Sequence, residues 1–221
     1  MQFMNASGKP VVAVLMNGSA LSVSWAAKNL NGIIESWYAG EEGRAAIVET
    51  FSGGNNPSDR LPVTFYTGID QLTPFENYSM QNRTYRYYNG TPLYPFGCGA
   101  QLLDVTYADV KLKPPTLKAG APLEVSVDLS NASGPDGDDV VELYLTPPQT
   151  LGNPLRAPRA FERVHVPGGS FPTRDSQIQS ARTQLRQSRG GTALSRPAHT
   201  RSPRQRPAAD ARCGRSRYPH H

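Results

Sequence analysis

The first 70 residues alternate between strand and helix patterns, and this alternation is the strongest constraint on the fold. The run "KPVVAVLMNG" places five apolar residues at 11–15, which is typical of a strand buried on both faces. Residues 33–38 and 60–65 predict two further strands. Helical patterns cover residues 25–27 and 45–51 between them. Strands that alternate with helices predict an α/β layer with a mostly parallel sheet.

This layer is too thin to stand as a complete domain. A parallel sheet needs cover on both faces, and three strands with two helices supply little of it. We therefore expect residues 1–70 to form part of an α/β sandwich that lacks strands on its N-terminal side. Residues 71–104 are aromatic, irregular and rich in proline and glycine, which predicts a long packed connector with one β-like piece at residues 84–88.

Residues 105–172 carry a different pattern, made of short strands separated by turn residues. In "LEVSVDL" the apolar side chains alternate with Glu124, Ser126 and Asp128, as in a half-buried antiparallel strand. Four or five such strands precede the end of the pattern near Phe171, whereas a β-sandwich needs about seven. We therefore expect an incomplete β-sandwich over this range.

The charge of the chain is divided unevenly. Residues 173–221 hold eleven Arg, no Lys and two Asp, so this tail carries 11 − 2 = +9. The other residues carry 12 − 16 = −4, and the two parts sum to the net charge of +5. Few apolar residues and high net charge predict a disordered tail. An Arg-rich tail on a binding scaffold is the alternative, with contacts to nucleic acid through phosphates.

Five motifs in the body occur in an order that resembles a known family. They are "GKPVVAVLMNGSAL", "WYAGEEG", "NPSDRLPVTF", "RTYRYYNGTPLYPFG" and "VVELYL". Over residues 8–169 the chain resembles the C-terminal half of glycoside hydrolase family 3, close to bacterial β-xylosidases and β-glucosidases. The resemblance implies the end of an α/β-sandwich domain, a connector, and a fibronectin type III-like domain that is incomplete here.

The resemblance also implies a chemistry, which is retaining, exo-acting hydrolysis of β-xylosides or β-glucosides. That reaction uses two carboxylates about 5 Å apart, a nucleophile and an acid/base. In the family, the nucleophile Asp lies on a first, barrel-shaped domain and the acid/base Glu precedes "GKPVV". We therefore assign no catalytic, cofactor-binding or metal-binding residue in this chain, leave its substrate-binding residues unassigned, and expect it to be inactive alone.

Glu41 and Glu42 are the most tempting substitutes for the missing pair. Adjacent residues of a helix point about 100° apart, so the two carboxylates do not face each other as an acid and a base would. We expect them in the first turn of the helix at residues 45–51, where the helix dipole favours negative charge.

Four other polar residues invite a site interpretation. Asp136, Asp138 and Asp139 resemble a calcium loop in charge, but the spacing lacks the terminal Glu of an EF-hand, so a solvated turn is the preferred interpretation. His165 lies in a predicted strand and is interpreted as structural.

The family pattern breaks at two places, and both suggest a change of reading frame. Residues 100–103 can be encoded so that the next frame reads Leu-Ser-Tyr, which the family has there. Residues 173–185 can likewise be encoded so that the next reading frame resembles the following part of the family pattern. The tail is therefore interpreted as frameshifted translation without a selected function.

The expected partners follow from this interpretation. They are a carbohydrate substrate in the complete enzyme only and the upstream family 3 domains, with no specific nucleic acid, no membrane and no cofactor. The first ten residues lack the charged and apolar blocks of a secretory signal, which predicts a cytoplasmic location.

Overall fold

The structure is a computed structural model that describes most of the chain up to residue 169. The described residues are 2–58, 60–99, 103, 105–113, 122–147, 152–169 and 183–184. The expectation of disorder over residues 173–221 therefore lies outside the described residues, except that residues 183–184 form a short strand. The suggested frame change at residues 100–103 lies outside them too, apart from residue 103.

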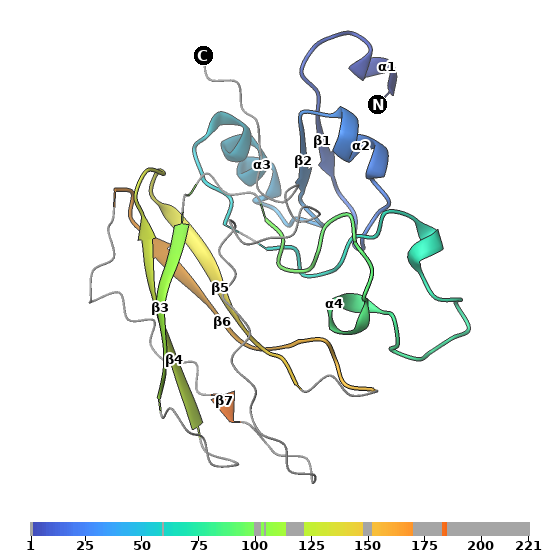
Figure 1. Cartoon of the computed structure of the whole chain (residues 1–221). Helices are drawn as coiled ribbons and strands as arrows, with labels where there is room; N and C mark the ends of the chain where they lie inside the picture. Colours follow the sequence, from blue (N-terminus) through green and yellow to red (C-terminus); the bar gives the residue numbers. More distant parts are fainter. Residues whose placement is uncertain are drawn as a thin grey trace.

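The N-terminal part contains a parallel pair of strands, β1 (Val12–Leu15) and β2 (Gly32–Glu35). Helix α2 (Ser24–Asn29) connects them, and α3 (Gly43–Ser52) follows β2, after the short α1 (Gln2–Asn5) at the start (Figure 1). The first two predicted strands and both predicted helices are confirmed, with the second strand three residues shorter at its C-terminal end than predicted.

The third predicted strand, at residues 60–65, is wrong. Phe65 pairs only with Tyr94, in an isolated antiparallel bridge with N–H···O distances of 2.9 and 3.1 Å. Leu61 exchanges backbone hydrogen bonds with Gly97 and Cys98. This segment therefore uses its backbone donors and acceptors on the end of the connector, so it does not join β1 and β2.

The connector contains two short helical turns, η1 (Ile69–Gln71) and α4 (Thr84–Tyr87). The predicted β-like piece at residues 84–88 is wrong, because the Tyr88 N–H donates to the Thr84 carbonyl at 2.9 Å and closes a helical turn. Asn82 and Thr84 have φ of 58° and 57°, so the chain turns sharply before α4 in a conformation that pattern alone does not reveal.

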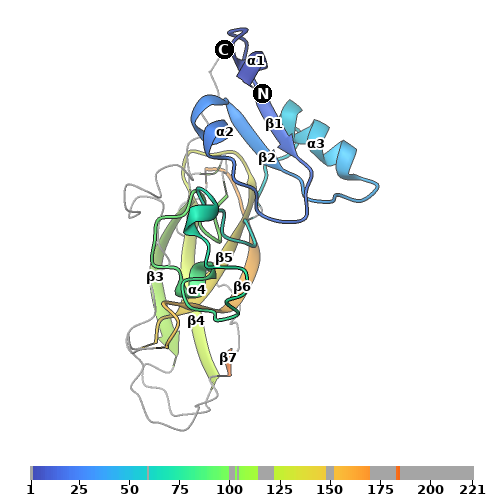
Figure 2. The same cartoon turned by 90° about the vertical axis from the view of Figure 1, so that its right-hand side faces the viewer.

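The C-terminal part is built from antiparallel strands, as predicted. Strand β3 (Val105–Lys113) pairs with β4 (Pro122–Asn131), and β4 also pairs with β7 (Thr183–Gln184). Strand β5 (Gly137–Leu145) pairs with β6 (Ala157–Val166) in a second sheet. Figure 2 shows β3, β4, β5 and β6 running roughly along one direction, with the β1–β2 unit at one end.

The main hydrophobic cluster of this part joins the two sheets. Val105 and Leu129 come from the first sheet and Val166 from the second, and all three are buried. Leu103, Tyr107, Val141 and Val164 pack around them. The alternation read from the sequence of β4 is confirmed where side chains are described, since Val127 and Leu129 are buried and Asp128 is not.

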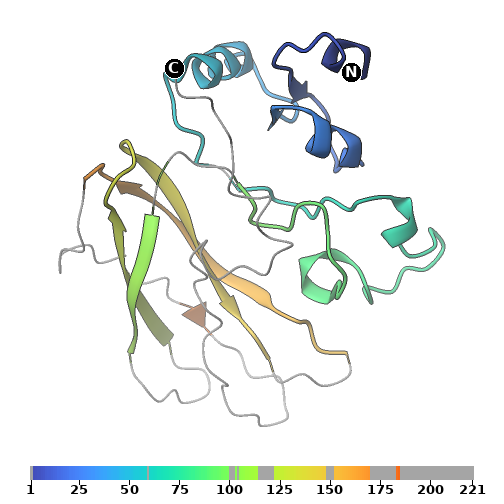
Figure 3. The ribbon, with the colours of Figure 1, turned by 45° about the horizontal axis from the view of Figure 1, so that its top comes forward.

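Helix α3 stands out because none of its residues is buried. Val48 and Phe51, which fall within the predicted helical pattern at residues 45–51, are 59% and 52% exposed. In Figure 3, α3 lies beside the β1–β2 pair as a separate element and is not part of the sheets formed by strands β3–β6. Within the described part of the chain, the side chains of Val48 and Phe51 are therefore left largely uncovered.

Candidate functional site

Glu41 and Glu42 lie at the surface, just before α3. Both are exposed, and α3 begins at Gly43, so Glu42 occupies the N-cap position and neither carboxylate is in the first turn. This is a shift of one or two residues from the expectation, the usual uncertainty at a helix end. The helix start still favours their negative charge.

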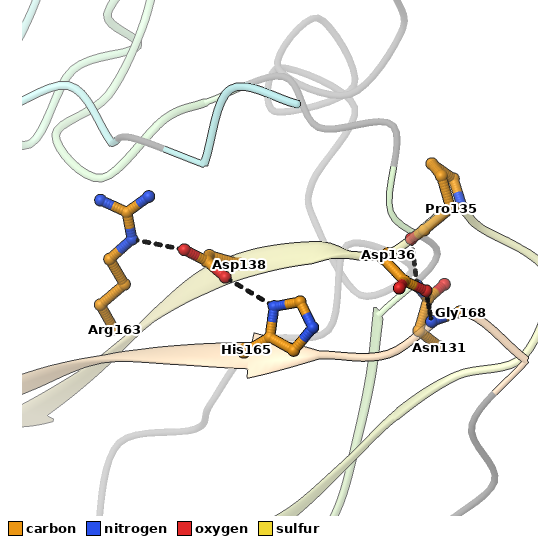
Figure 4. Close-up of polar contacts among 7 residues, drawn as sticks. All are labelled: Asn131, Pro135, Asp136, Asp138, Arg163, His165 and Gly168. Atoms are coloured by element: carbon orange, nitrogen blue, oxygen red, sulfur yellow. Dashed lines mark hydrogen bonds and ion pairs between the residues drawn. The ribbon is translucent and has the colours of Figure 1, made fainter. Parts of the chain in front are cut away.

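Asp138 and His165 are brought together by the pairing of β5 with β6. Asp138 faces His165 in the strand register, and its carboxylate lies 2.9 Å from the Nδ1 of His165 (Figure 4). The Arg163 Nε–H donates to the same carboxylate at 2.8 Å. The hydrogen bonds from His165 and Arg163 hold the pKa of Asp138 below its usual value. This cross-strand cluster is exposed and links strand β5 to strand β6.

Side-chain hydrogen bonds of Asn131 and Asp136 stabilise the turn between β4 and β5. Asn131 is fully buried, and its side chain donates to the Pro135 carbonyl at 2.7 Å and accepts from the Gly134 N–H at 2.9 Å. Asp136 accepts from the Gly168 N–H at 2.6 Å, as Figure 4 shows. Among the described residues, no group of three or more His, Cys, Asp or Glu could hold a metal ion.

Asp139 lies in strand β5 and is completely buried, so the interpretation of this acidic stretch as a solvated turn is wrong for Asp139. Its carboxylate forms an ion pair with Arg60 and accepts a hydrogen bond from the Tyr107 hydroxyl. Burial, followed by the charge of Asp139, raises the pKa of Tyr107. Three elements therefore meet at one desolvated carboxylate: the segment that precedes the connector, strand β3 and strand β5.

Neither Arg60 nor Tyr107 was predicted from the sequence to contact Asp139. Arg60 is part of the motif "NPSDRLPVTF", which could have marked it as important, but its partner lies 79 residues further along the chain. Tyr107 falls in an ordinary strand pattern that carries no signal of a buried polar contact.

A second polar group lies at the carboxyl ends of β1 and β2. Glu35 accepts the Trp37 N–H at 3.1 Å and lies 3.5 Å from the Asn17 amide. Burial raises the pKa of Glu35, and Trp37 has φ of 53°, which is uncommon for a bulky residue. The Trp37 ring packs against the buried Phe65 at 6.3 Å. These contacts fix the start of the loop that leads to Glu41.

The family of the chain is decided by comparison with known proteins. The glycosyl hydrolase family 3 C-terminal domain matches residues 1–102. A xylan 1,4-β-xylosidase from Xylanibacter ruminicola is 30% identical over 88% of this chain. A periplasmic β-glucosidase from Salmonella typhimurium is 32% identical over 77% of it. Residues 1–102 belong to glycosyl hydrolase family 3.

Solved structures of family 3 enzymes support the same assignment. A β-glucosidase from Erythrobacter marinus superposes with a TM-score of 0.65 at 32% identity, over 76% of this chain and 23% of its own. A β-glucosidase from Listeria innocua gives 0.63 at 29% identity, over 76% and 25%. The chain spans 22% of the Xylanibacter protein and 24% of the Salmonella protein, so about a quarter of a family 3 enzyme is present.

Proposed function

We propose that this chain is the C-terminal part of a retaining, exo-acting β-glycosidase that acts on β-xylosides or β-glucosides. The observation that carries the proposal is the match of residues 1–102 to the family's C-terminal domain. Relatives named as β-xylosidases and β-glucosidases, similar to this chain over 75% or more of its length, give the substrate class.

The two catalytic carboxylates are proposed to belong to another part of the enzyme. Retention requires a pair of carboxyl groups about 5 Å apart on either side of the scissile bond. The carboxylates of Asp138, Asp139 and Glu142 are engaged by Arg163, Arg60 and Tyr144 respectively. Because these carboxylates form contacts that stabilise the fold, they favour a structural role for the chain. Retaining hydrolysis by carboxylates needs no cofactor.

The division of the chain is proposed in the family's terms. Residues 1–70 belong to a partial α/β sandwich, residues 71–104 to the connector, and residues 105–172 to a fibronectin type III-like domain. The two antiparallel sheets around Val105, Leu129 and Val166 support the last of these. The partner is the preceding part of a family 3 enzyme. In the described part of the chain, no helix is both long and apolar enough to cross a membrane.

The experiment measures hydrolysis of nitrophenyl β-xyloside and nitrophenyl β-glucoside by the purified chain. We expect no turnover above the buffer blank from the chain alone. The preceding part of the Xylanibacter relative, expressed separately and then mixed with the chain, should gain activity. Turnover that stays with the chain through a second purification would contradict the proposal, and so would a soluble complex of both parts without activity.

A further inference from the structure

The connector holds an exposed apolar loop at residues 68–83, which contains η1 and ends at α4. In Figure 1 this connector loop lies on the side of the molecule away from β3 and β4, and Figure 2, viewed from that side, shows it in front of the strands. Phe75 and Tyr78 are each 87% exposed. The large apolar residues of the loop that are exposed are Ile69, Leu72, Phe75, Tyr78 and Met80.

The connector loop is organised around one inward-facing cation. The Arg83 guanidinium donates to the carbonyls of Pro74, Asn77 and Ser79 at 3.3, 2.6 and 3.1 Å respectively. The Asn77 side chain in turn accepts the Ser79 N–H at 3.0 Å. These bonds fix the backbone on both sides of Phe75 and Tyr78, so the two aromatic side chains are carried on an ordered loop.

The base of the connector loop is fixed as well. The Gln71 side chain accepts the Thr67 N–H at 2.9 Å and donates to the Thr91 carbonyl at 3.2 Å. Ordering these residues costs conformational entropy, and the exposed apolar side chains recover little of it by burial within this chain. A loop that is already ordered loses little further freedom when it binds, which favours association.

The exposed apolar area is large for a surface loop. An aromatic side chain buries about 150–250 Å² when it is fully covered, so Phe75 and Tyr78 together present on the order of 400 Å². Exposed apolar patches larger than a few hundred Å² mark interaction sites. Aromatic residues are also enriched at protein interfaces. The connector loop therefore has the size and composition of an interaction surface.

Charge narrows the chemistry of the partner. Asp70 and Glu76 are exposed on the connector loop, whereas the Arg83 cation is engaged by backbone carbonyls. The exposed part of the loop is therefore acidic and suits an apolar surface that carries Arg or Lys. Symmetric pairing of two copies through this loop would bring the same acidic residues together, which disfavours a second copy as the partner.

We propose that the connector loop docks, through Phe75 and Tyr78, on the preceding part of the glycosidase, at an apolar surface bordered by basic side chains. The chain spans 22% of the Xylanibacter relative and 24% of the Salmonella relative, so most of each relative lies outside the matched part and is available to cover the loop. The identity of the partner rests on the proposed function, whereas the interaction surface rests on the order and exposure of the loop.

The test is calorimetric titration of the chain with the separately expressed preceding part of the Xylanibacter relative, once a cooperative thermal melt has shown that this part is folded. The double variant Phe75→Gln/Tyr78→Gln should raise the Kd at least tenfold, because a few aromatic residues carry most of the binding energy of an interface. Phe161→Gln, at a phenylalanine 80% exposed on β6, is the matched control and should bind like the unchanged chain.

Two further measurements separate docking from a structural role. Both variants should melt at the temperature of the unchanged chain, since the substituted side chains are exposed. Arg83→Met keeps every apolar side chain of the loop but removes its internal hydrogen bonds, so it should also weaken binding. Cleavage by chymotrypsin after Phe75 or Tyr78 should be slower in the complex than in the free chain.

The outcomes distinguish this inference from the proposed function. A complex that the double variant forms with an unchanged Kd would overturn the inference and leave the proposed function intact. If the double substitution instead abolished self-association of the chain and spared the complex, the loop would bind a second copy, which would also overturn the inference. Absence of any complex with the unchanged chain would contradict the inference and the proposed function together.

Discussion

Arg60 and Asp139 form a buried ion pair that joins the two parts of the chain. Their side chains are 14% and 1% exposed. Arg60 lies within residues 1–102, which match the family's C-terminal domain, and Asp139 lies on β5, beyond that match. The ion pair therefore connects the family-matched segment to strand β5. The Tyr107 hydroxyl, from β3, donates a hydrogen bond to the same carboxylate.

Asp139→Asn should destabilise the chain by about 3–5 kcal/mol, because it leaves the Arg60 charge buried without its partner. The measurement is urea unfolding followed by circular dichroism. Asp138→Asn is the matched control, since it changes the neighbouring residue in an exposed ion pair and should cost no more than about 1 kcal/mol. Equal losses for the two variants would show that the buried pair does not hold the parts together.

Tyr107→Phe should cost about 1.5–3 kcal/mol, since it removes a hydrogen bond to a buried carboxylate and leaves the ring in place. The same urea experiment measures it. Tyr78→Phe removes a hydroxyl from a tyrosine that is 87% exposed and should leave the unfolding free energy unchanged. If Tyr107→Phe is as neutral as Tyr78→Phe, the hydroxyl contributes nothing to the network.

Asp138 should give the fold a small acid sensitivity. Its pKa is lowered in the folded chain, so the stabilisation is present above the unfolded value of 3.8 and is lost as pH falls through the lower folded pKa. Asp138→Asn lacks this contribution. Thermal melts of both proteins should therefore differ at pH 6, and the difference should shrink as the pH falls below 3.8. A difference that stays constant over that range would contradict the assignment.

Phe51→Gln should reduce self-association without loss of stability, because Phe51 is half exposed on the uncovered face of α3. Surface substitutions of this kind change the unfolding free energy by about 0.5 kcal/mol or less. Leu129→Ala, in the buried cluster, should instead cost about 2–5 kcal/mol. Size-exclusion chromatography and thermal melts distinguish them, and an equally destabilised Phe51→Gln would mean that the α3 face is not free.

Local pattern was enough to predict the elements whose neighbours are close in the sequence. The apolar run of β1 and the alternation of β4 appear in the structure as predicted, because burial on two faces or on one face dictates each pattern. Residues 60–65 were also predicted to be a strand of this sheet, yet Leu61 bonds to Gly97 and Cys98. The choice of partner strand is a tertiary property that the segment itself does not encode.

The polar contacts were less predictable than the strands. Asp138 and Asp139 are adjacent in sequence, but the strand places one at the surface and the other in the interior, with different partners. The alternation of a strand predicts that they point to opposite faces. Which face is buried depends on Arg60 and Tyr107, which arrive from elsewhere in the chain.

We propose that the catalytic nucleophile of the complete glycosidase lies outside this chain. A retaining enzyme forms a covalent glycosyl intermediate on its nucleophilic carboxylate, and 2-deoxy-2-fluoro glycosyl fluorides make that intermediate long-lived. The decisive measurement is the intact mass of the purified chain after incubation with the xylosyl and glucosyl reagents. We expect an unchanged mass with both reagents. The addition of one fluorosugar to a single Asp or Glu, located by peptide mapping, would contradict it.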